Sequence, residues 1–289
     1  MHRIPLKTPL LLLFLVASAE VKADRHKPST TYRNFCSACH GLKGDGFGKA
    51  SRYLFPKPRD FRASPLQYAT SINRIASSRD ILHVVKNGIS NSSMNGWSDL
   101  SDIQLNEVVQ DVLSFRLEGA RERYYFAVSE DTGESSTGTP SISTANTGLS
   151  AYLSQNTVAG PKWLLASLKI GEPNLTQGKL LYQTQNCHKC HGVDGRGSYG
   201  IDLTGEFGYP AFARNLVQES YKYGSEELDV ARTIRLGIAG TKMPASPTLT
   251  DEQLRDLSRY VLSLKGQETI ETTNNQRYRR AIGATLQRK

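Results

Sequence analysis

Four cysteines have the most chemically informative spacing in this chain. They form two C-x-x-C-H sequences, at residues 36–40 and 187–191, and the chain has no other cysteine. Two thiols three positions apart can each form a thioether to one edge of a porphyrin, and the next histidine can ligate the iron. The motifs predict two covalently bound c-type haems, attached through Cys36, Cys39, Cys187 and Cys190, with His40 and His191 as axial iron ligands.

Other uses of paired cysteines fit this sequence less well. A thioredoxin-like redox site does not require histidine after the second cysteine, and here that histidine occurs twice. Paired zinc-binding motifs usually lie about 15–20 residues apart, whereas these lie roughly 150 apart. A disulfide framework is possible in an exported chain, but the two haem motifs already use every cysteine.

A second axial ligand is expected from methionine. Apart from Met1, the chain contains only Met94 and Met243, and each follows a Gly-Ile pair at the same spacing. A thioether is a good sixth ligand for haem iron, although methionine is more often a core residue. The repeat favours Met94 and Met243 as ligands. His83 is a weaker competitor for the first haem, His26 is expected at the surface, and His188 is expected to point away from the iron.

The segments around the motifs repeat one plan. Helices are predicted before each motif (residues 30–35 and 174–185), before each methionine (77–86 and 226–236), and after each methionine. Ser101 with Gln104, and Thr250 with Gln253, have the form of capping boxes that start the last helices. An apolar stripe follows on each of these helices. The first consists of Leu105, Val108, Val112 and Phe115, and the second of Leu254, Leu257, Val261 and Leu264. Gly119 and Gly266 are expected near the ends of these helices.

Proline-containing loops follow both haem motifs, at residues 55–61 and 209–212. Proline prevents a regular helix there. The backbone carbonyl of Pro56 or Pro58, and that of Pro210, could accept a hydrogen bond from the free ring nitrogen of the axial histidine and so fix its orientation. A plain surface turn is the alternative.

The first 23 residues have the features of a signal peptide. A basic start precedes an apolar run at residues 10–17, with cleavage expected after Ala19 or Ala23. This run is too short to cross a bilayer, and no later segment is apolar enough to be transmembrane. The sequence therefore predicts an exported, periplasmic protein, which agrees with c-type haem attachment.

The remaining chain is predicted to be all-α, with two haem-binding domains. The expected boundaries are 24–128 for the first domain, 129–160 for a Ser/Thr/Gly-rich linker, 161–266 for the second domain and 267–289 for a basic tail. The apolar stretch that starts at Trp163 is expected to pack on one domain or between the two. The formal charge of +9 favours redox partner proteins with acidic docking surfaces, and no nucleic-acid-binding motif is present.

Each half resembles a class I cytochrome c domain. The second half has Gly178 and Tyr182 on its entering helix, the Met243-Pro244 pair and Tyr260 on its last helix, and the resemblance implies that Gly178 and Tyr260 pack where these helices cross. The first half resembles diheme cytochromes that accompany periplasmic dehydrogenases, through its Pro-Arg-Asp-Phe sequence at residues 58–61. It departs from the pattern in two ways: its entering helix is short, and Asp111 stands in the last helix where an aromatic residue is expected. The first domain is therefore expected to be less compact or to lean on the second.

This resemblance implies electron transfer rather than catalysis. Two six-coordinate haems would pass single electrons from a redox enzyme or quinol-oxidising complex to a downstream acceptor, with the chain either free or a subunit of a larger complex. The alternative is a diheme peroxidase-like or other catalytic cytochrome, in which one haem can open.

Overall fold

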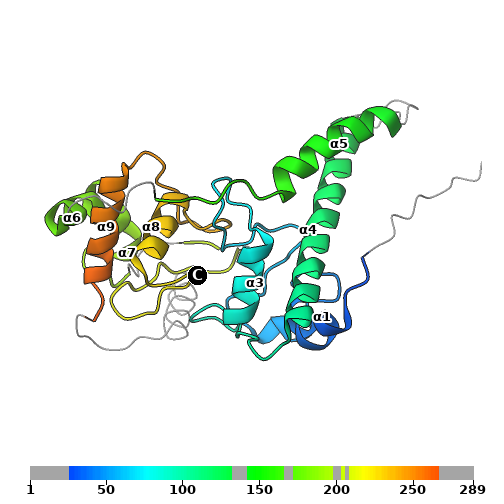
Figure 1. Ribbon diagram of the computed structural model, residues 1–289, viewed down its shortest axis with the longest axis horizontal. Coiled ribbons are helices and arrows are strands. Elements are labelled where there is room, and N and C mark those ends of the chain that lie inside the picture. Colours follow the sequence, from blue (N-terminus) through cyan, green and yellow to red (C-terminus); the bar gives the residue numbers. More distant parts are fainter. Residues whose placement is uncertain (1–25, 132–141, 166–171, 198–202, 206–207, 267–289) are drawn as a thin grey trace, which may run out of the picture.

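The computed structural model describes residues 26–131, 142–165, 172–197, 203–205 and 208–266. Within these ranges the chain is helical, with no β-strand and only isolated bridges between Ser71 and Lys162 and between Thr204 and Pro210. The all-α prediction is confirmed. The predicted signal peptide and basic tail lie outside the described residues. Two groups of helices are visible in Figure 1, one formed by each half of the sequence.

The first half begins with short helices around the first motif, α1 (Thr30–Phe35) and α2 (Ser37–His40), and the 3-10 turn η1 (Ser51–Tyr53). Helix α3 (Ser78–Asn87) starts at a capping box of Ser77 and Asp80. Helix α4 spans Asp102–Asp131, and the predicted Ser101–Gln104 capping box is present at its start. Its predicted stripe of Leu105, Val108, Val112 and Phe115 is buried in a core with α1 and α3.

Helix α4 continues well past the predicted end at Gly119. The Arg62 carbonyl oxygen lies 2.1 Å from where a β-carbon of Gly119 would be. Arg62 also pairs with Glu118 (2.6 Å) and Glu122 on the same helix. Gly119 is therefore not a helix end. It is the point where the loop that contains Arg62 comes closest to the backbone of α4.

The predicted linker contains helix α5 (Ile142–Thr157), which packs against the second half of α4. Tyr124 on α4 contacts Tyr152 on α5, with ring centroids 5.3 Å apart. Figure 1 shows these helices side by side in an arm that projects from the first domain. The Ser, Thr and Gly content of this segment gave little hydrophobic periodicity, so the sequence did not predict this helix.

After α5 the chain returns to the first domain. Ile72 N donates to Pro161 O at 2.9 Å, and Trp163 N donates to Thr70 O at 2.7 Å. The Trp163 side chain packs against the core of the second half. The segment around Trp163 therefore lies between the two halves, one of the two positions expected for it.

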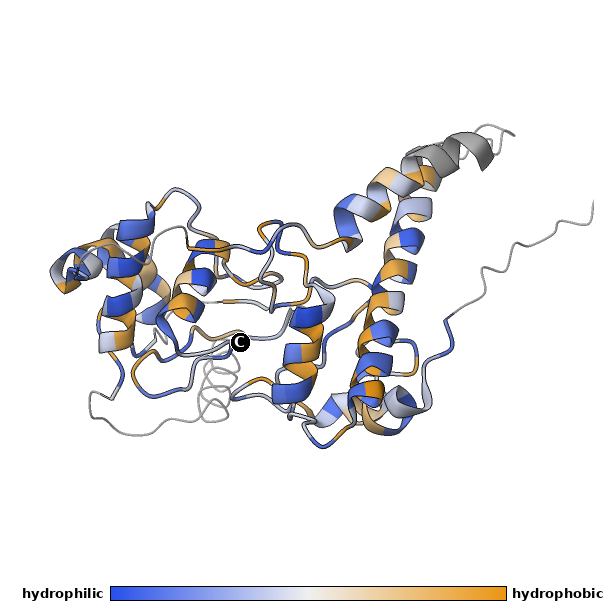
Figure 2. Cartoon of the chain, in the orientation of Figure 1, coloured by the Kyte–Doolittle hydropathy of each residue, from blue (hydrophilic) through white to orange (hydrophobic). Residues whose placement is uncertain are grey.

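The second half contains α6 (Leu175–Thr184), α7 (Cys187–His191), α8 (Glu227–Leu236) and α9 (Asp251–Ser263). The Thr250–Gln253 capping box starts α9, as predicted. Hydrophobic residues on amphipathic helices, seen as orange bands in Figure 2, form a second core that includes Leu254, Leu257 and Val261. At Gly178, where α6 crosses α9, a β-carbon would lie 2.2 Å from Asp256 O and 2.7 Å from Tyr260 Cβ.

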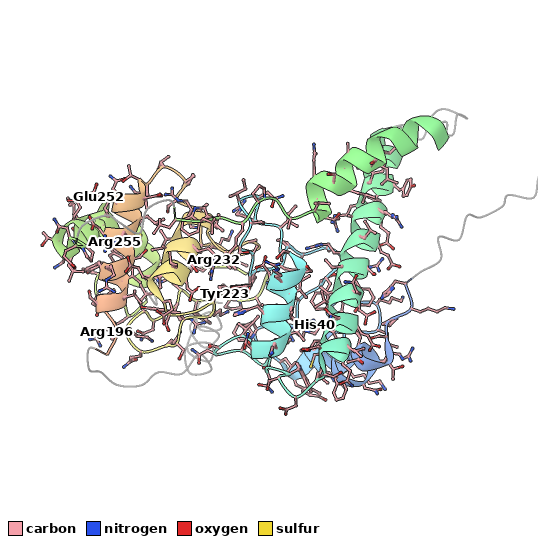
Figure 3. All side chains as sticks on the ribbon, viewed as in Figure 1. His40, Arg196, Tyr223, Arg232, Glu252 and Arg255 are labelled. Carbon is pink, nitrogen blue, oxygen red and sulfur yellow. The ribbon has the colours of Figure 1, made fainter. Side chains whose placement is uncertain are left out.

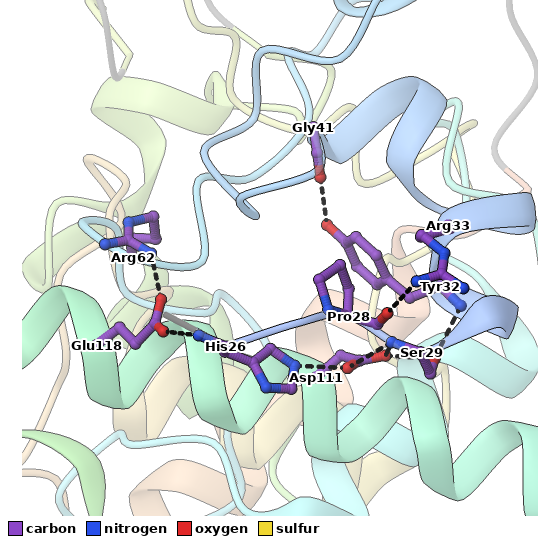
Figure 4. A network of polar contacts seen from close by, with 9 residues as sticks. All are labelled: His26, Pro28, Ser29, Tyr32, Arg33, Gly41, Arg62, Asp111 and Glu118. Atoms are coloured by element: carbon purple, nitrogen blue, oxygen red, sulfur yellow. Dashed lines mark hydrogen bonds and ion pairs between the residues drawn. The ribbon is translucent and has the colours of Figure 1, made fainter. Parts of the chain in front are cut away.

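Asp111 anchors the start of the described chain, as Figure 4 shows. Its carboxylate accepts hydrogen bonds from His26 Nε2 (2.6 Å), Ser29 Oγ (2.6 Å) and Ser29 N (3.1 Å), and only 2% of the residue is exposed. The His26 ring packs edge-on against Phe115. His26 is therefore half-buried rather than fully exposed as expected, because Asp111 draws the segment onto α4.

We predict that Asp111→Ala destabilises the holoprotein by about 3 kcal/mol, since it leaves Ser29 and His26 without their buried acceptor. Thermal unfolding of the two proteins would measure this difference. The matched control is Asp99→Ala, an exposed carboxylate whose described contact is a 3.5 Å hydrogen bond from Ser98. Equal loss of stability in both variants would contradict the anchoring role.

Candidate haem-binding sites

Both motif histidines are oriented by a backbone carbonyl. His40 Nδ1 lies 3.0 Å from Arg59 O, and His191 Nδ1 lies 2.9 Å from Arg214 O. A carbonyl can only accept, so each Nδ1 carries the hydrogen and each Nε2 has a free lone pair. Burial lowers the pKa of both histidines. Neutral imidazoles with a fixed tautomer are the form that ligates a metal.

The two loops that supply these carbonyls are held in the same way. Phe61 N donates to Gly44 O, and Leu216 N donates to Gly195 O, both at 2.7 Å. Gly44 and Gly195 occupy equivalent places after the two motifs. The predicted hydrogen bond to the histidine is therefore present, but its acceptor is Arg59 rather than Pro56 or Pro58. In the second half it is Arg214 rather than Pro210, because the chain continues past the proline before it reaches the histidine.

The two methionines lie in matching turns. Ile89 N donates to Met94 O at 2.9 Å, and Ile238 N donates to Met243 O at 3.2 Å. A hydroxyl supports each turn: Ser92 Oγ accepts from Met94 N at 3.1 Å, and Thr241 Oγ1 accepts from Met243 N at 3.2 Å. The sequence repeat is thus also a repeat of backbone structure.

In the second half, the predicted site residues are brought together. Cys187, Cys190, His191 and Met243 line one cavity of about 600 Å³. Its wall is largely apolar and includes Leu216, Ile234, Leu257 and Val261. This volume suits a cofactor. Two thiols, an oriented imidazole and a thioether around an apolar cavity are the donor set that a covalent haem requires.

In the first half, α1 and α2 bring together Cys36, Cys39 and His40. Cys36 is part of the buried core, and the His40 ring stacks on Phe61 with centroids 4.5 Å apart. Met94 is half-buried. Its turn is equivalent to that of Met243, and no described contact joins its side chain to that of His40. The four cysteine sulfurs form no disulfide.

A tyrosine braces the turn after each motif. Tyr32 Oη donates to Gly41 O at 2.9 Å, and Tyr182 Oη donates to Gly192 O at 2.7 Å. Tyr182 was part of the family pattern, whereas the role of Tyr32 was missed. The signal was available in the sequence, because each tyrosine lies about one helical turn before its first cysteine.

The other described histidines lie apart from these donor sets. His83 is exposed on α3, and its ring stacks on Tyr68 with centroids 4.9 Å apart. His188 is half-buried and is not among the described residues that line the second cavity.

The first half also contributes to the second cavity. Five of its residues line the cavity wall: Phe55, Pro56, Lys57, Arg59 and Gln67. Nearby, Tyr223 Oη donates to Gln67 Oε1 at 3.0 Å, and the Arg232 guanidinium lies over the Tyr68 ring at 5.1 Å. Figure 3 shows Tyr223 and Arg232 between the two groups of helices. The first domain does lean on the second, as its departures from the family pattern suggested.

The charges around this cavity are mostly positive. Its described lining includes Lys57, Arg59, Lys189, Arg214, Lys222 and Lys242. Glu219 is the one carboxylate among the described lining residues, and it pairs with Arg214 at 3.1 Å. Burial, helped by the charges of Arg214 and Arg59, lowers the pKa of Lys222 to about 8. These cationic residues were not predicted from the sequence, because they come from separate loops.

Comparison with known families identifies both halves. Residues 175–265 match the family model described as cytochrome c. Residues 23–110 match the model described as cytochrome c oxidase, cbb3-type, subunit III. Both halves are class I cytochrome c domains. The chain is therefore a tandem, diheme c-type cytochrome whose cofactor is covalently bound haem c.

Two individual relatives of this cytochrome are informative. The chain is 33% identical over 90 residues to the cbb3-type cytochrome c oxidase subunit CcoP of Azospirillum brasilense, a match that covers 31% of this chain and 28% of that protein. The structure of the present cytochrome is similar to that of a chain in the reducing HAO-like protein complex Kustc0457/Kustc0458 of Kuenenia stuttgartiensis. That match has a TM-score of 0.63 and 26% sequence identity, and covers 81% of this chain and 94% of the other.

Among its described residues, the cytochrome has no helix that is both long enough and apolar enough to span a bilayer.

Proposed function

We propose that this cytochrome carries single electrons between a redox enzyme or quinol-oxidising complex and a downstream acceptor, without catalysis of its own. Haem supplies one-electron redox chemistry when bound. The observation that carries the proposal is the match between the two halves. Each half has a histidine oriented by a backbone carbonyl, and each has a methionine in an equivalent turn. A six-coordinate site leaves no iron position for a substrate.

The proposed role of each site residue follows from its chemistry. Cys36 and Cys39 attach the first haem, and Cys187 and Cys190 attach the second. His40 and Met94, and His191 and Met243, are the axial ligands. The boundaries proposed for the two domains remain 24–128 and 161–266, with residues 129–160 connecting them.

Partner contact is proposed at the exposed residues that follow each motif. Leu42 is 61% exposed, Phe47 is 73% exposed, and Val193, at the position equivalent to Leu42, is 71% exposed. Lysines such as Lys43 and Lys49 lie beside them in the sequence. An apolar contact surrounded by positive charge suits a partner with an acidic docking surface.

The proposed location is the periplasm, and the support is the predicted signal peptide at residues 1–23. We also propose that the cytochrome works within a larger complex. Support comes from its relatives, since one is named as an oxidase subunit and the other as part of a protein complex.

Carbon monoxide binding to the fully reduced holoprotein tests the proposal. We expect neither haem to bind it readily, because Met94 and Met243 occupy the sixth positions. Optical spectroscopy would detect binding. Rapid binding at one haem in the unmodified protein would overturn the carrier function and favour a peroxidase-like protein with an openable haem.

A further inference from the structure

The internal repeat places two tyrosines at equivalent positions, and these tyrosines meet where the two halves of the chain touch. Each lies nine positions after the arginine whose carbonyl orients the axial histidine of its own half: Tyr68 follows Arg59, and Tyr223 follows Arg214. Their ring centroids are 5.4 Å apart, with the ring planes tilted by 43°. Contact between equivalent residues is typical of a two-fold symmetric dimer, and here it occurs within one chain.

The same correspondence holds for the helices beside this contact. His83 on α3 and Arg232 on α8 are equivalent, because each lies five positions before the glycine that ends its helix. Both approach the Tyr68 ring: the His83 ring stacks on it at 4.9 Å, and the Arg232 guanidinium lies over it at 5.1 Å. Arg232 Nη2 also donates to Tyr223 O at 2.9 Å, and Tyr223 Oη donates to Gln67 Oε1 at 3.0 Å. A cation over an aromatic ring and a hydrogen bond therefore join the two halves.

The two methionine turns extend this contact. Asn91 and Gly240 are equivalent residues of these turns, and both have a positive φ, of 55° and 70°. Asn91 Nδ2 donates to Ser220 O at 3.5 Å, and a β-carbon on Gly240 would lie 3.3 Å from Pro65 Cγ. Ser220 and Pro65 are themselves equivalent, since each comes three positions before one of the two tyrosines. Each methionine turn therefore lies against the loop of the other half that carries the histidine-orienting carbonyl.

Tyr223 connects this contact with the second haem site. It is 7% exposed, and it lines the cavity that His191 and Met243 also line. Burial raises the pKa of Tyr223 and that of Tyr68, so both phenols keep their hydrogens at neutral pH. Linked domains usually move relative to each other unless their interface holds them. The buried ring of Tyr223 and its contacts provide such a hold between the two halves.

We propose that the Tyr68–Tyr223 contact fixes the two haem sites relative to each other for electron exchange between them. The proposal rests on the proposed function, because it requires a haem with an axial methionine in each half. In each exchange one electron leaves one iron and reduces the other, and neither tyrosine is oxidised or reduced. Tyr68 and Tyr223 are thus positioning residues. They act by joining the loops and turns that carry the two sets of axial ligands.

Tyr68→Ala in the holoprotein removes the ring at the centre of this contact. We expect electron exchange between the haems to slow by on the order of tenfold or more, because small misplacements of reacting groups are costly. Proton NMR of the half-reduced protein measures the exchange rate, since the methyl signals of each haem depend on its oxidation state. The radius of gyration, measured by small-angle X-ray scattering, should rise as the domains separate. The optical spectrum of each haem should stay parental, because Tyr68 is not an axial ligand.

Arg232→Gln tests the same contact from the second half. It should also slow the exchange, and it serves as the test if Tyr68→Ala does not accumulate. The matched controls are Tyr125→Ala, at an exposed tyrosine of α4, and Arg79→Gln, at an exposed arginine of α3. Both controls should retain the parental exchange rate and radius of gyration.

A parental exchange rate in Tyr68→Ala or in Arg232→Gln would overturn the proposal, and so would equal slowing in the two controls. The absence of exchange in the half-reduced parental protein would also overturn it. A changed optical spectrum of one haem in Tyr68→Ala would show that Tyr68 acts within a single site, which again contradicts the proposal. Carbon monoxide binding to the parental protein reports separately on the carrier function. That function stands if both haems exclude carbon monoxide, even where exchange does not respond to these substitutions.

Discussion

Met243→Ala is expected to make the second haem accessible to carbon monoxide and to lower its reduction potential by on the order of 100 mV or more. The thioether is a soft ligand that favours reduced iron, and alanine has no donor atom to replace it. The change should appear in the optical spectrum of one haem only. Met94→Ala should produce the same result at the first haem, because the turn around Met94 has the same pattern of hydrogen bonds as the turn around Met243.

Thr248→Ala is the control for these variants, since it is an exposed change shortly after Met243 and outside the described cavity lining. It should leave both spectra unchanged. A Met243→Ala protein that still excludes carbon monoxide would show that another group ligates the second iron, and the assignment of Met243 would be withdrawn.

Gly178→Val is expected to destabilise the second domain by about 3 kcal/mol or more. A β-carbon at this position would overlap the Asp256 carbonyl oxygen at 2.2 Å and Tyr260 Cβ at 2.7 Å. Neither neighbour can move without separating α6 from α9. Helix α6 leads into the second motif on α7, and its packing against α9 closes the core of this half. Thermal unfolding of the holoprotein, followed by circular dichroism, would measure the loss.

Lys179→Val provides the comparison, because it places the same β-branched residue at the next, exposed position of α6. It should cost only the difference in helix propensity, well under 1 kcal/mol. If the two variants unfold at the same temperature, the close crossing at Gly178 does not limit stability.

The local features of this fold were largely predictable from the sequence. The apolar stripes of α4 and α9, the capping boxes at Ser101 and Thr250, and the glycines that follow α3 and α8 all depend on residues a few positions apart. Short-range patterns of this kind set where a helix begins and which face is buried. The axial ligands were also proposed from spacing, and the structure places the four residues of the second site around one cavity.

Features that depend on distant contacts were not predictable in the same way. The sequence predicts a helix end near Gly119, but the role of this glycine depends on Arg62, from a loop that is far away in sequence. His26 was expected at the surface, and its contact with Asp111 makes it half-buried. Helix α5 had no clear apolar stripe, and it is positioned by the extension of α4. The contribution of Arg59 to the second cavity depends on how the two domains pack, which no pattern within either repeat records.

The return of the chain onto residues 70–73 has a kinetic consequence. Hydrogen bonds fix the chain to the first domain as far as Trp163, so only about ten residues separate this anchor from the start of α6. A tether this short gives the two domains a high effective concentration with respect to each other, in the millimolar range or above. We therefore expect electron exchange between the haems to be a first-order process, so that dilution of the protein slows exchange with partners and leaves internal exchange unchanged.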